Sequence, residues 1–137
     1  MPRYLADSSI WSWANDGRRP DIADKLAERF EDGEIVTCVP VVLEAMHRAR
    51  SRQQYGALMG DLFAPIDWLP LGETQSLRAV AVQEQLADTT EGNHRRPAVD
   101  YLVAAIAEAD EETVLWSFDK DLAIICEHTE QPHEAES

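Results

Sequence analysis

The segment that most constrains the fold is residues 113–118, whose sequence TVLWSF is almost continuously apolar. Such a run predicts a strand that is covered on both faces, as in the interior of a parallel sheet. Two similar short runs, residues 3–6 and 34–39, occur earlier in the chain. A sheet that is covered on both faces requires helices above and below it, so the sequence predicts three layers.

Helical patterns alternate with these strands. Ile22, Leu26 and Phe30 recur every four residues between Pro20 and Gly33, which predicts a helix that the proline begins and the glycine ends. The other expected segments are a short helix or turn at 10–14, helices at 41–50, 53–63 and 73–88, an edge strand at 66–71, a polar loop at 89–96, helices at about 97–109 and 119–126, and a tail at 129–137 that frays or forms a last edge segment. This alternation predicts a single domain over residues 1–137, an α/β/α sandwich with a mostly parallel sheet.

Two of these helices carry apolar stripes that we expect in the core. The expected core residues are Val42, Leu43, Met46 and Ala49 in the helix at 41–50, and Leu77, Val80, Ala81 and Ala87 in the helix at 73–88.

The negative net charge of the chain disfavours binding to a polyanion unless a local group of basic residues contacts it. Its 12 Lys and Arg against 26 Asp and Glu give a net charge of −14, which repels a polyanion such as RNA at long range. Two basic patches, Arg48 with Arg50 and Arg52, and residues 94–96, either contact such a ligand locally or are solvated surface charge. No apolar run is long enough for a membrane span or a secretion signal, so a cytoplasmic protein with no membrane partner is expected.

Acidic residues recur where the predicted strands end and where helices begin. Asp7 closes the first strand, and Glu44 lies one turn into the helix after the second. Asp100 lies in the first turn of a later helix, while Asp119 and Asp121 follow the last strand. Because ligands of α/β sheets bind beyond the carboxyl ends of the strands, we expect these acids to meet there.

Each acid also has an ordinary structural explanation when it is taken alone. Asp119 can cap a helix, and Asp100 and Asp121 are favourable near the positive end of a helix dipole. Glu44 can pair with Arg48 one turn further on. From the residues alone, these alternatives stay open.

Taken together, the acids point to a metal site. Two carboxylates 4 Å apart repel each other by about 4 kcal/mol at an effective dielectric constant of 20. A cluster of such groups is relieved by protons or by divalent cations, and oxygen-only ligands suit Mg²⁺ or Mn²⁺. Metal ions held in this way support the hydrolysis of phosphodiesters.

Four segments of the chain resemble the motifs of PIN-domain ribonucleases of the VapC toxin type. They are LADSS at 5–9, VLEA at 42–45, VDYLVAA at 99–105 and SFDKDL at 117–122, and the resemblance covers nearly the whole chain. It implies a PIN-like fold and a Mg²⁺- or Mn²⁺-dependent endoribonuclease, the toxin of a toxin–antitoxin pair, which hydrolyses RNA with a metal-activated water and inhibits translation. It also implies a cognate VapB-type antitoxin and a homodimer.

The same resemblance implies roles for individual residues. Asp7, Asp100 and Asp119 would be metal ligands, Glu44 a ligand directly or through water, and Asp121 either part of a second metal site or only a helix start. Ser9 and Ser117 would orient water or a phosphate. The chain departs from the family pattern in a long polar insert at 88–96 and in a short end at 131–134.

Two other functions compete with this interpretation. A PIN-like binding module with weak or no catalysis would keep the fold and lose turnover. A phosphatase or phosphotransfer domain with an aspartate nucleophile needs adjacent acids or an Asp-x-Asp motif after the first strand, where this chain has Asp7-Ser8-Ser9.

Overall fold

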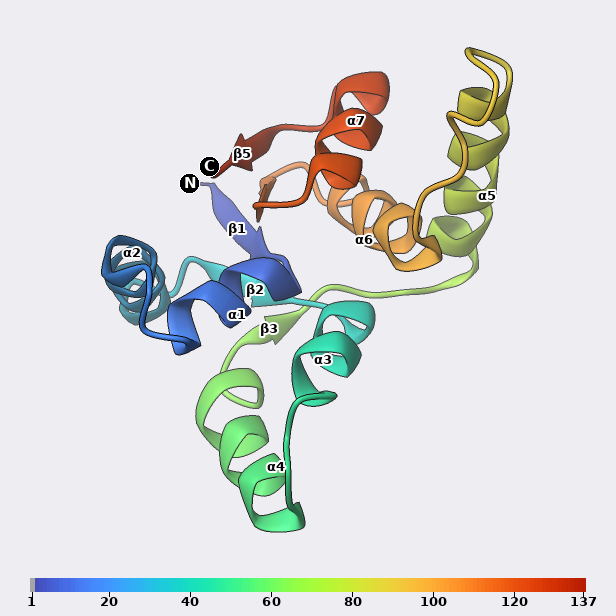
Figure 1. The fold of residues 1–137 in the computed structure, drawn as a ribbon. Coiled ribbons are helices and arrows are strands. Elements are labelled where there is room, and N and C mark those ends of the chain that lie inside the picture. The colour runs from blue at the N-terminus through green and yellow to red at the C-terminus, as the bar shows by residue number, and fades with distance from the viewer. Residues whose placement is uncertain (1) are drawn as a thin grey trace.

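Five parallel strands form one sheet in the computed structural model, which describes residues 2–137 (Figure 1). The strands are β1 (Arg3–Ala6), β2 (Ile35–Thr37), β3 (Asp67–Trp68), β4 (Thr113–Ser117) and β5 (His133–Ala135). Their order across the sheet is β3-β2-β1-β4-β5, and each neighbouring pair is parallel. The predicted α/β architecture with a mostly parallel sheet is therefore confirmed.

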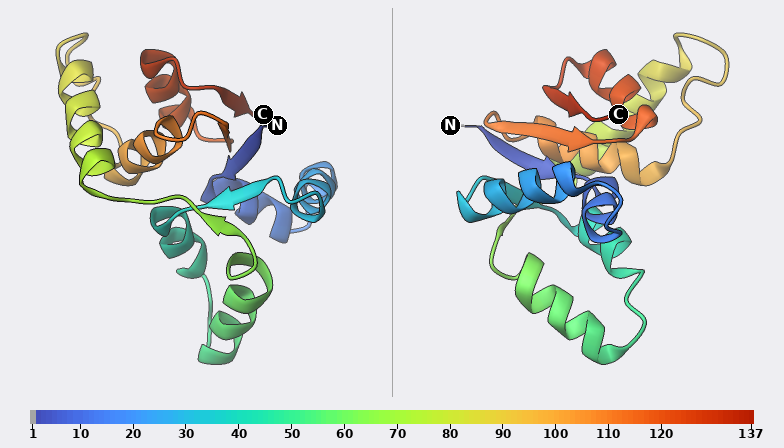
Figure 2. Two further views of the ribbon diagram at one scale, coloured as in Figure 1. Left: turned by 180° about the vertical axis from the view of Figure 1, so that it is seen from behind. Right: turned by 60° about the vertical axis from the view of Figure 1, so that its left-hand side comes forward.

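Helices cover both faces of this sheet. They are α1 (Ser8–Asn15), α2 (Pro20–Glu31), α3 (Val39–Met46), α4 (Arg52–Leu58), the π-helical η1 (Met59–Phe63), α5 (Glu73–Ala87), α6 (Ala98–Glu108) and α7 (Lys120–Thr129). Figures 1 and 2 show α1 and α2 on one face and α6 and α7 on the other, with α5 packed outside α6. Among residues 2–137, every helix is too short or too polar to cross a membrane.

Strands β1 and β4 form the centre of the core. Leu5 and Ala6 of β1 and Leu115 and Trp116 of β4 are fully buried, and they pair across the two strands. Successive residues of a strand point to opposite faces of the sheet. Both faces are therefore covered at this position, as the apolar run at 113–118 predicts.

The buried face of α5 is not the predicted one. Leu77 and Val80 are 62% and 61% exposed, and Ala87 is exposed as well, whereas Val82 and Leu86 are buried. Apolar residues at helical spacing occur on both sides of α5, so the sequence offers two stripes. Packing against α6 buries only one of them, and the prediction that Leu77 and Val80 face the core is wrong.

We expect two substitutions on α5 to separate these faces. Leu86→Ala should lower the free energy of unfolding by about 3 kcal/mol, because it leaves a cavity in the core. Leu77→Ala should change it by less than about 0.5 kcal/mol, since that side chain is mostly in solvent. Urea denaturation followed by circular dichroism measures both, and equal losses would contradict the observed packing.

Helix α3 is shorter than predicted, and one of its residues lies outside the core. It ends four residues before the predicted end at residue 50. The reason is the next helix, where the Ser51 hydroxyl caps α4 by accepting a hydrogen bond from Gln54 N at 3.0 Å, which requires an extended backbone at Ser51. Val42 and Met46 are buried as predicted, but Leu43 is 65% exposed, so its assignment to the core is wrong.

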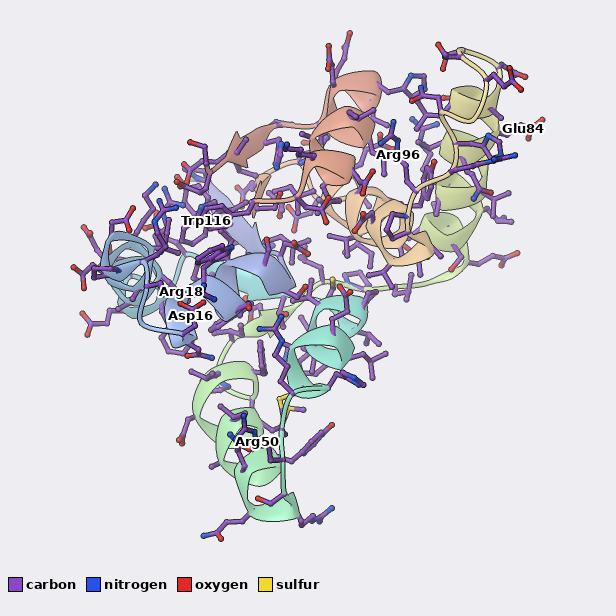
Figure 3. All side chains as sticks on the ribbon, viewed as in Figure 1. Asp16, Arg18, Arg50, Glu84, Arg96 and Trp116 are labelled. Atoms are coloured by element: carbon purple, nitrogen blue, oxygen red, sulfur yellow. The ribbon has the colours of Figure 1, made fainter. Side chains whose placement is uncertain are left out.

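The C-terminal tail forms the edge strand β5, which is the second of the two alternatives expected for it. Glu134 of β5 accepts hydrogen bonds from both terminal nitrogens of Arg29, at 2.8 and 3.0 Å. The Arg29 guanidinium lies over the rings of Tyr4 and Trp116, 3.7 and 4.5 Å from their centres (Trp116 is labelled in Figure 3). The tail is thus held by charge and aromatic contacts rather than by an apolar pattern of its own.

Candidate metal centre

Asp7 and Asp119 follow neighbouring parallel strands and lie at the same edge of the sheet. All four residues of β1 pair with β4, so the chain leaves the two strands at nearly the same level. Each acid also caps a helix: Asp7 accepts a hydrogen bond from Ser9 N at 3.3 Å, and Asp119 accepts one from Asp121 N at 2.7 Å. The capping explanation is therefore correct for Asp119, but it engages only Oδ1 of that carboxylate.

Glu44 and Asp100 approach the same edge from helices that pack against each other, α3 and α6. Asp100 lies in the first turn of α6 and is 5% exposed. Glu44 accepts a hydrogen bond from the Ser8 hydroxyl at 3.3 Å. Within residues 2–137 Glu44 makes no ion pair with Arg48, which donates instead to the Ser12 hydroxyl. The helix-pair explanation of Glu44 is therefore wrong.

Four of the five predicted acids line one cleft of about 290 Å³. They are Asp7, Glu44, Asp100 and Asp119, and the wall is completed by Ser8, Ser9, Ser12, Trp13, Arg48 and Pro97. The four acids come from four separate segments of the chain. The structure therefore brings together carboxylates that the sequence connects only through their positions at strand ends and helix starts.

Asp121 lies beside this cleft and outside its lining. One oxygen each of Asp100, Asp119 and Asp121 lie within 4.8 Å of one another. Oδ1 of Asp121 also accepts a hydrogen bond from Arg96 Nη1 at 2.7 Å. The site thus has a fixed positive charge at its rim that the sequence interpretation missed. The sequence signal for this positive charge is the basic run at 94–96. Taken alone, that run is more simply explained as solvated surface charge.

The two predicted serines hold the turns that carry the acids. The Ser9 hydroxyl donates to Asp7 Oδ2 at 2.9 Å and accepts from Phe118 N at 3.0 Å, so it joins the end of β1 to the end of β4. The Ser117 hydroxyl is buried, accepts from Asp119 N at 3.3 Å and lies 2.8 Å from His133 Nε2. Ser117 is outside the lining of the cleft, and its hydroxyl supports the turn that carries Asp119.

Burial raises the pKa of two of the acids. The pKa of Asp7 lies above its ordinary value of 3.8 because the side chain is desolvated, although hydrogen bonds from Ser9 act in the other direction. Desolvation, followed by the negative charges of Asp119 and Asp7, raises the pKa of Asp100 to about 8. Asp100 Oδ2 is buried and has no hydrogen-bond partner within residues 2–137. Such an oxygen requires a proton or a cation. Oxygens of Asp100, Asp119 and Asp121 are close enough to one another to share a divalent ion, and Asp7 and Glu44 line the same cleft.

The raised pKa of Asp100 predicts a particular pH dependence of the metal-free protein. Between pH 4 and 8 the folded state keeps a proton on Asp100 that the unfolded chain releases, so the free energy of unfolding falls as the pH rises through this range. Asp7 contributes with the same sign. Urea titrations in EDTA at pH 5 and pH 8 measure the effect, and Asp100→Asn should make the pH dependence shallower. A pH dependence that is unchanged in this variant would contradict the assignment.

Comparisons with known proteins agree with this arrangement. The PIN domain family matches residues 4–127 of the chain. Two relatives named Ribonuclease VapC21, from two strains of Mycobacterium tuberculosis, are each 31% identical over 133 residues, which cover 96% of this chain and 92% of theirs. A solved structure, DNA-bound VapBC from Salmonella typhimurium, has a similar fold, with a TM-score of 0.73 and 13% identity over 98% of both chains. The chain therefore belongs to the PIN domain family and, within it, to the VapC type.

Proposed function

We propose that this chain is a metal-dependent endoribonuclease, the toxin of a toxin–antitoxin pair, which hydrolyses RNA phosphodiester bonds and so inhibits translation. The observation that carries the proposal is the cleft lined by Asp7, Glu44, Asp100 and Asp119. Membership of the PIN domain family and the ribonuclease names of its relatives support the reaction class. The aspartate-nucleophile alternative has no support from these comparisons.

In this proposal Asp7, Asp100 and Asp119 hold the ion, and Glu44 holds it directly or through water. The buried and unpartnered Oδ2 of Asp100 supports a cation at this place. Ligands that are all carboxylate oxygens favour Mg²⁺ or Mn²⁺ over softer metals. We therefore propose Mg²⁺ or Mn²⁺ as the cofactor.

The protein's part in the reaction is to hold charged groups around the scissile phosphate. A bound Mg²⁺ or Mn²⁺ would activate water and stabilise the charge that develops on the phosphate. Ser9 fixes the Asp7 carboxylate, and Arg48 in the cleft wall offers a positive charge to an RNA phosphate. Cys38 supplies no nucleophile, because burial raises the pKa of its thiol to about 12. The scheme takes water as the attacking group.

A second, larger hollow adjoins the cleft and is where we place the antitoxin. This groove of about 950 Å³ shares Ser8, Ser12, Glu44 and Arg48 with the acidic cleft. The rest of its lining is mostly apolar side chains of α1, α3, η1 and α6, with the polar Asn15, His47, Arg50 and Gln54 among them. A VapB-type antitoxin that filled the groove would also cover the acids. The net charge of −14 favours a basic arm on that partner. We also propose a homodimer, which sedimentation would report as about twice the 15.4 kDa of one chain.

Cleavage of RNA by the purified protein tests the metal-dependent reaction. We expect cleavage in Mg²⁺ or Mn²⁺ and none in EDTA, with activity restored when the metal is returned. Asp7→Asn should lower the rate by at least about a hundredfold, because it removes a ligand charge from the site. Asp24→Asn removes the same charge from an exposed position on α2 and should leave the rate unchanged.

Two measurements in cells, growth after induction and the sequences of RNA ends, complete this test. Induction of the parent should arrest growth, and sequencing of RNA 5′ ends should show new cleavage sites that Asp7→Asn does not make. Cleavage that survives in Asp7→Asn would contradict the metal site. A parent that binds antitoxin tightly but leaves RNA intact would instead establish the binding module without turnover.

A further inference from the structure

Arg96 is a nearly buried arginine at the rim of the metal centre. It ends the loop between α5 and α6, its side chain is 13% exposed, and Figure 3 labels it close to α7. Its Nη1 donates to Asp121 Oδ1 at 2.7 Å, and its Nη2 donates to Asn93 Oδ1 at 2.6 Å. With two nitrogens engaged, the guanidinium has a fixed place.

The loop that carries Arg96 is itself anchored to the site. The buried Tyr101 of α6 donates its hydroxyl hydrogen to the backbone oxygen of His94 at 2.7 Å. Asn93 Nδ2 donates to the Thr89 hydroxyl at 2.8 Å, which keeps the Asn93 amide in position for Arg96. Since α6 also carries Asp100, the loop holds Arg96 at a defined position relative to the acids.

Asp121 differs from the other acids in two ways. Its side chain is 40% exposed and lies outside the lining of the acidic cleft, whereas Asp100 and Asp119 line it. It is also the acid that already has a cationic partner. A carboxylate oxygen that accepts a hydrogen bond from a guanidinium has much of its charge compensated, and a metal ion on the same group would be repelled by the arginine.

We propose that Arg96 is the resident counter-ion of Asp121 and a positioning residue of the metal centre. The ion pair withdraws Asp121 from the set of metal ligands, so binding is confined to Asp7, Glu44, Asp100 and Asp119. This inference rests on the metal site proposed above. It answers a question that the sequence leaves open, because Asp121 is close enough to Asp100 and Asp119 to share an ion with them.

Mn²⁺ binding to the metal-free protein tests this role without any measurement of RNA cleavage. The free-ion signal in electron paramagnetic resonance gives both the number of bound ions and the dissociation constant. We expect Asp121→Asn to bind as many ions as the parent, with a dissociation constant within about tenfold. Arg96→Gln should bind Mn²⁺ at least about tenfold more tightly or take up an additional ion, because it frees the Asp121 carboxylate to act as a ligand.

Two further variants serve as matched controls. Arg95→Gln removes the same charge from the neighbouring exposed residue, which takes part in no ion pair among residues 2–137, and should bind like the parent. The double variant Arg96→Gln/Asp121→Asn should lose the gain of Arg96→Gln and return to the behaviour of Asp121→Asn. This return would show that the gain acts through Asp121.

Several results would overturn the inference. If Asp121→Asn loses an ion or binds more than about a hundredfold more weakly, Asp121 is a ligand. If Arg96→Gln binds no more tightly than Arg95→Gln, the arginine does not withhold Asp121. If Mn²⁺ binding by the parent does not depend on Asp100, the proposed metal site is contradicted instead. In that case a gain of Mn²⁺ binding in Arg96→Gln that requires Asp121 would still support the counter-ion role. If Arg96→Gln shows no such gain, the counter-ion role is overturned as well.

Discussion

Asp100→Asn is expected to abolish RNA cleavage while it makes the metal-free protein more stable. Asp100 is buried, and one of its oxygens has no partner among residues 2–137. Its charge therefore destabilises the fold without a cation, yet in the proposed metal site the same charge holds the cation. Asparagine keeps the shape of the side chain and removes the charge. We expect the cleavage rate to fall at least about a hundredfold, and the free energy of unfolding in EDTA at pH 8 to rise by about 2 kcal/mol.

These two changes are measured on the same protein preparation. RNA cleavage is followed in saturating Mn²⁺, and stability is measured by urea denaturation in EDTA. Asp24→Asn, at an exposed position, should alter neither quantity by much. If Asp100→Asn lost activity and stability together, the loss of cleavage would reflect unfolding, and the buried charge of Asp100 would not be what destabilises the metal-free protein.

Removal of residues 131–137 is expected to have the largest effect on stability. The deletion takes away β5, its ladder with β4, and the Glu134 carboxylate that Arg29 holds. The deletion also removes the buried Gln131, whose Nε2 donates a hydrogen bond to the backbone oxygen of Thr113 at 2.8 Å. We expect the free energy of unfolding to fall by about 4 kcal/mol or more, which is a large part of the stability of a small domain.

A point variant separates the ion pair from the strand itself. Glu134→Gln should cost about 2 kcal/mol, because it leaves the half-buried Arg29 without its charged partner. Glu127→Gln, the same change at an exposed position on α7, should cost less than about 0.5 kcal/mol. Urea denaturation measures all three proteins. If the truncated protein has the same free energy of unfolding as the parent, β5 contributes nothing to the stability of the fold in solution.

The sequence predicts most of the fold because its strands are short apolar runs with helical patterns between them. It fails where more than one choice is locally acceptable. Helix α5 has two apolar stripes, and only contact with α6 shows that Leu86 rather than Leu77 is buried. The segment His133–Ala135 has no strand pattern, and its pairing depends on Arg29, which lies 105 residues earlier than Glu134.

The candidate site, like the fold, is predictable from the sequence only in part. Its four acids are predictable because each stands at a strand end or a helix start, where a parallel sheet places its ligands. The partner of Asp121 is not predictable, because Arg96 reaches it through a loop of irregular shape from 25 residues away in the chain. Sequence spacing gives no measure of such a contact, and a basic run before a motif is equally consistent with a solvated surface.

The most direct test of the metal centre is anomalous X-ray scattering from crystals of the protein soaked in Mn²⁺. The proposed site predicts a strong peak in the acidic cleft, about 2.1 Å from carboxylate oxygens of Asp7, Asp100 and Asp119. It also predicts that Asp121 keeps its contact with Arg96 in the loaded protein. A Mn²⁺ peak at another place, with the cleft between these acids empty, would contradict the central claim.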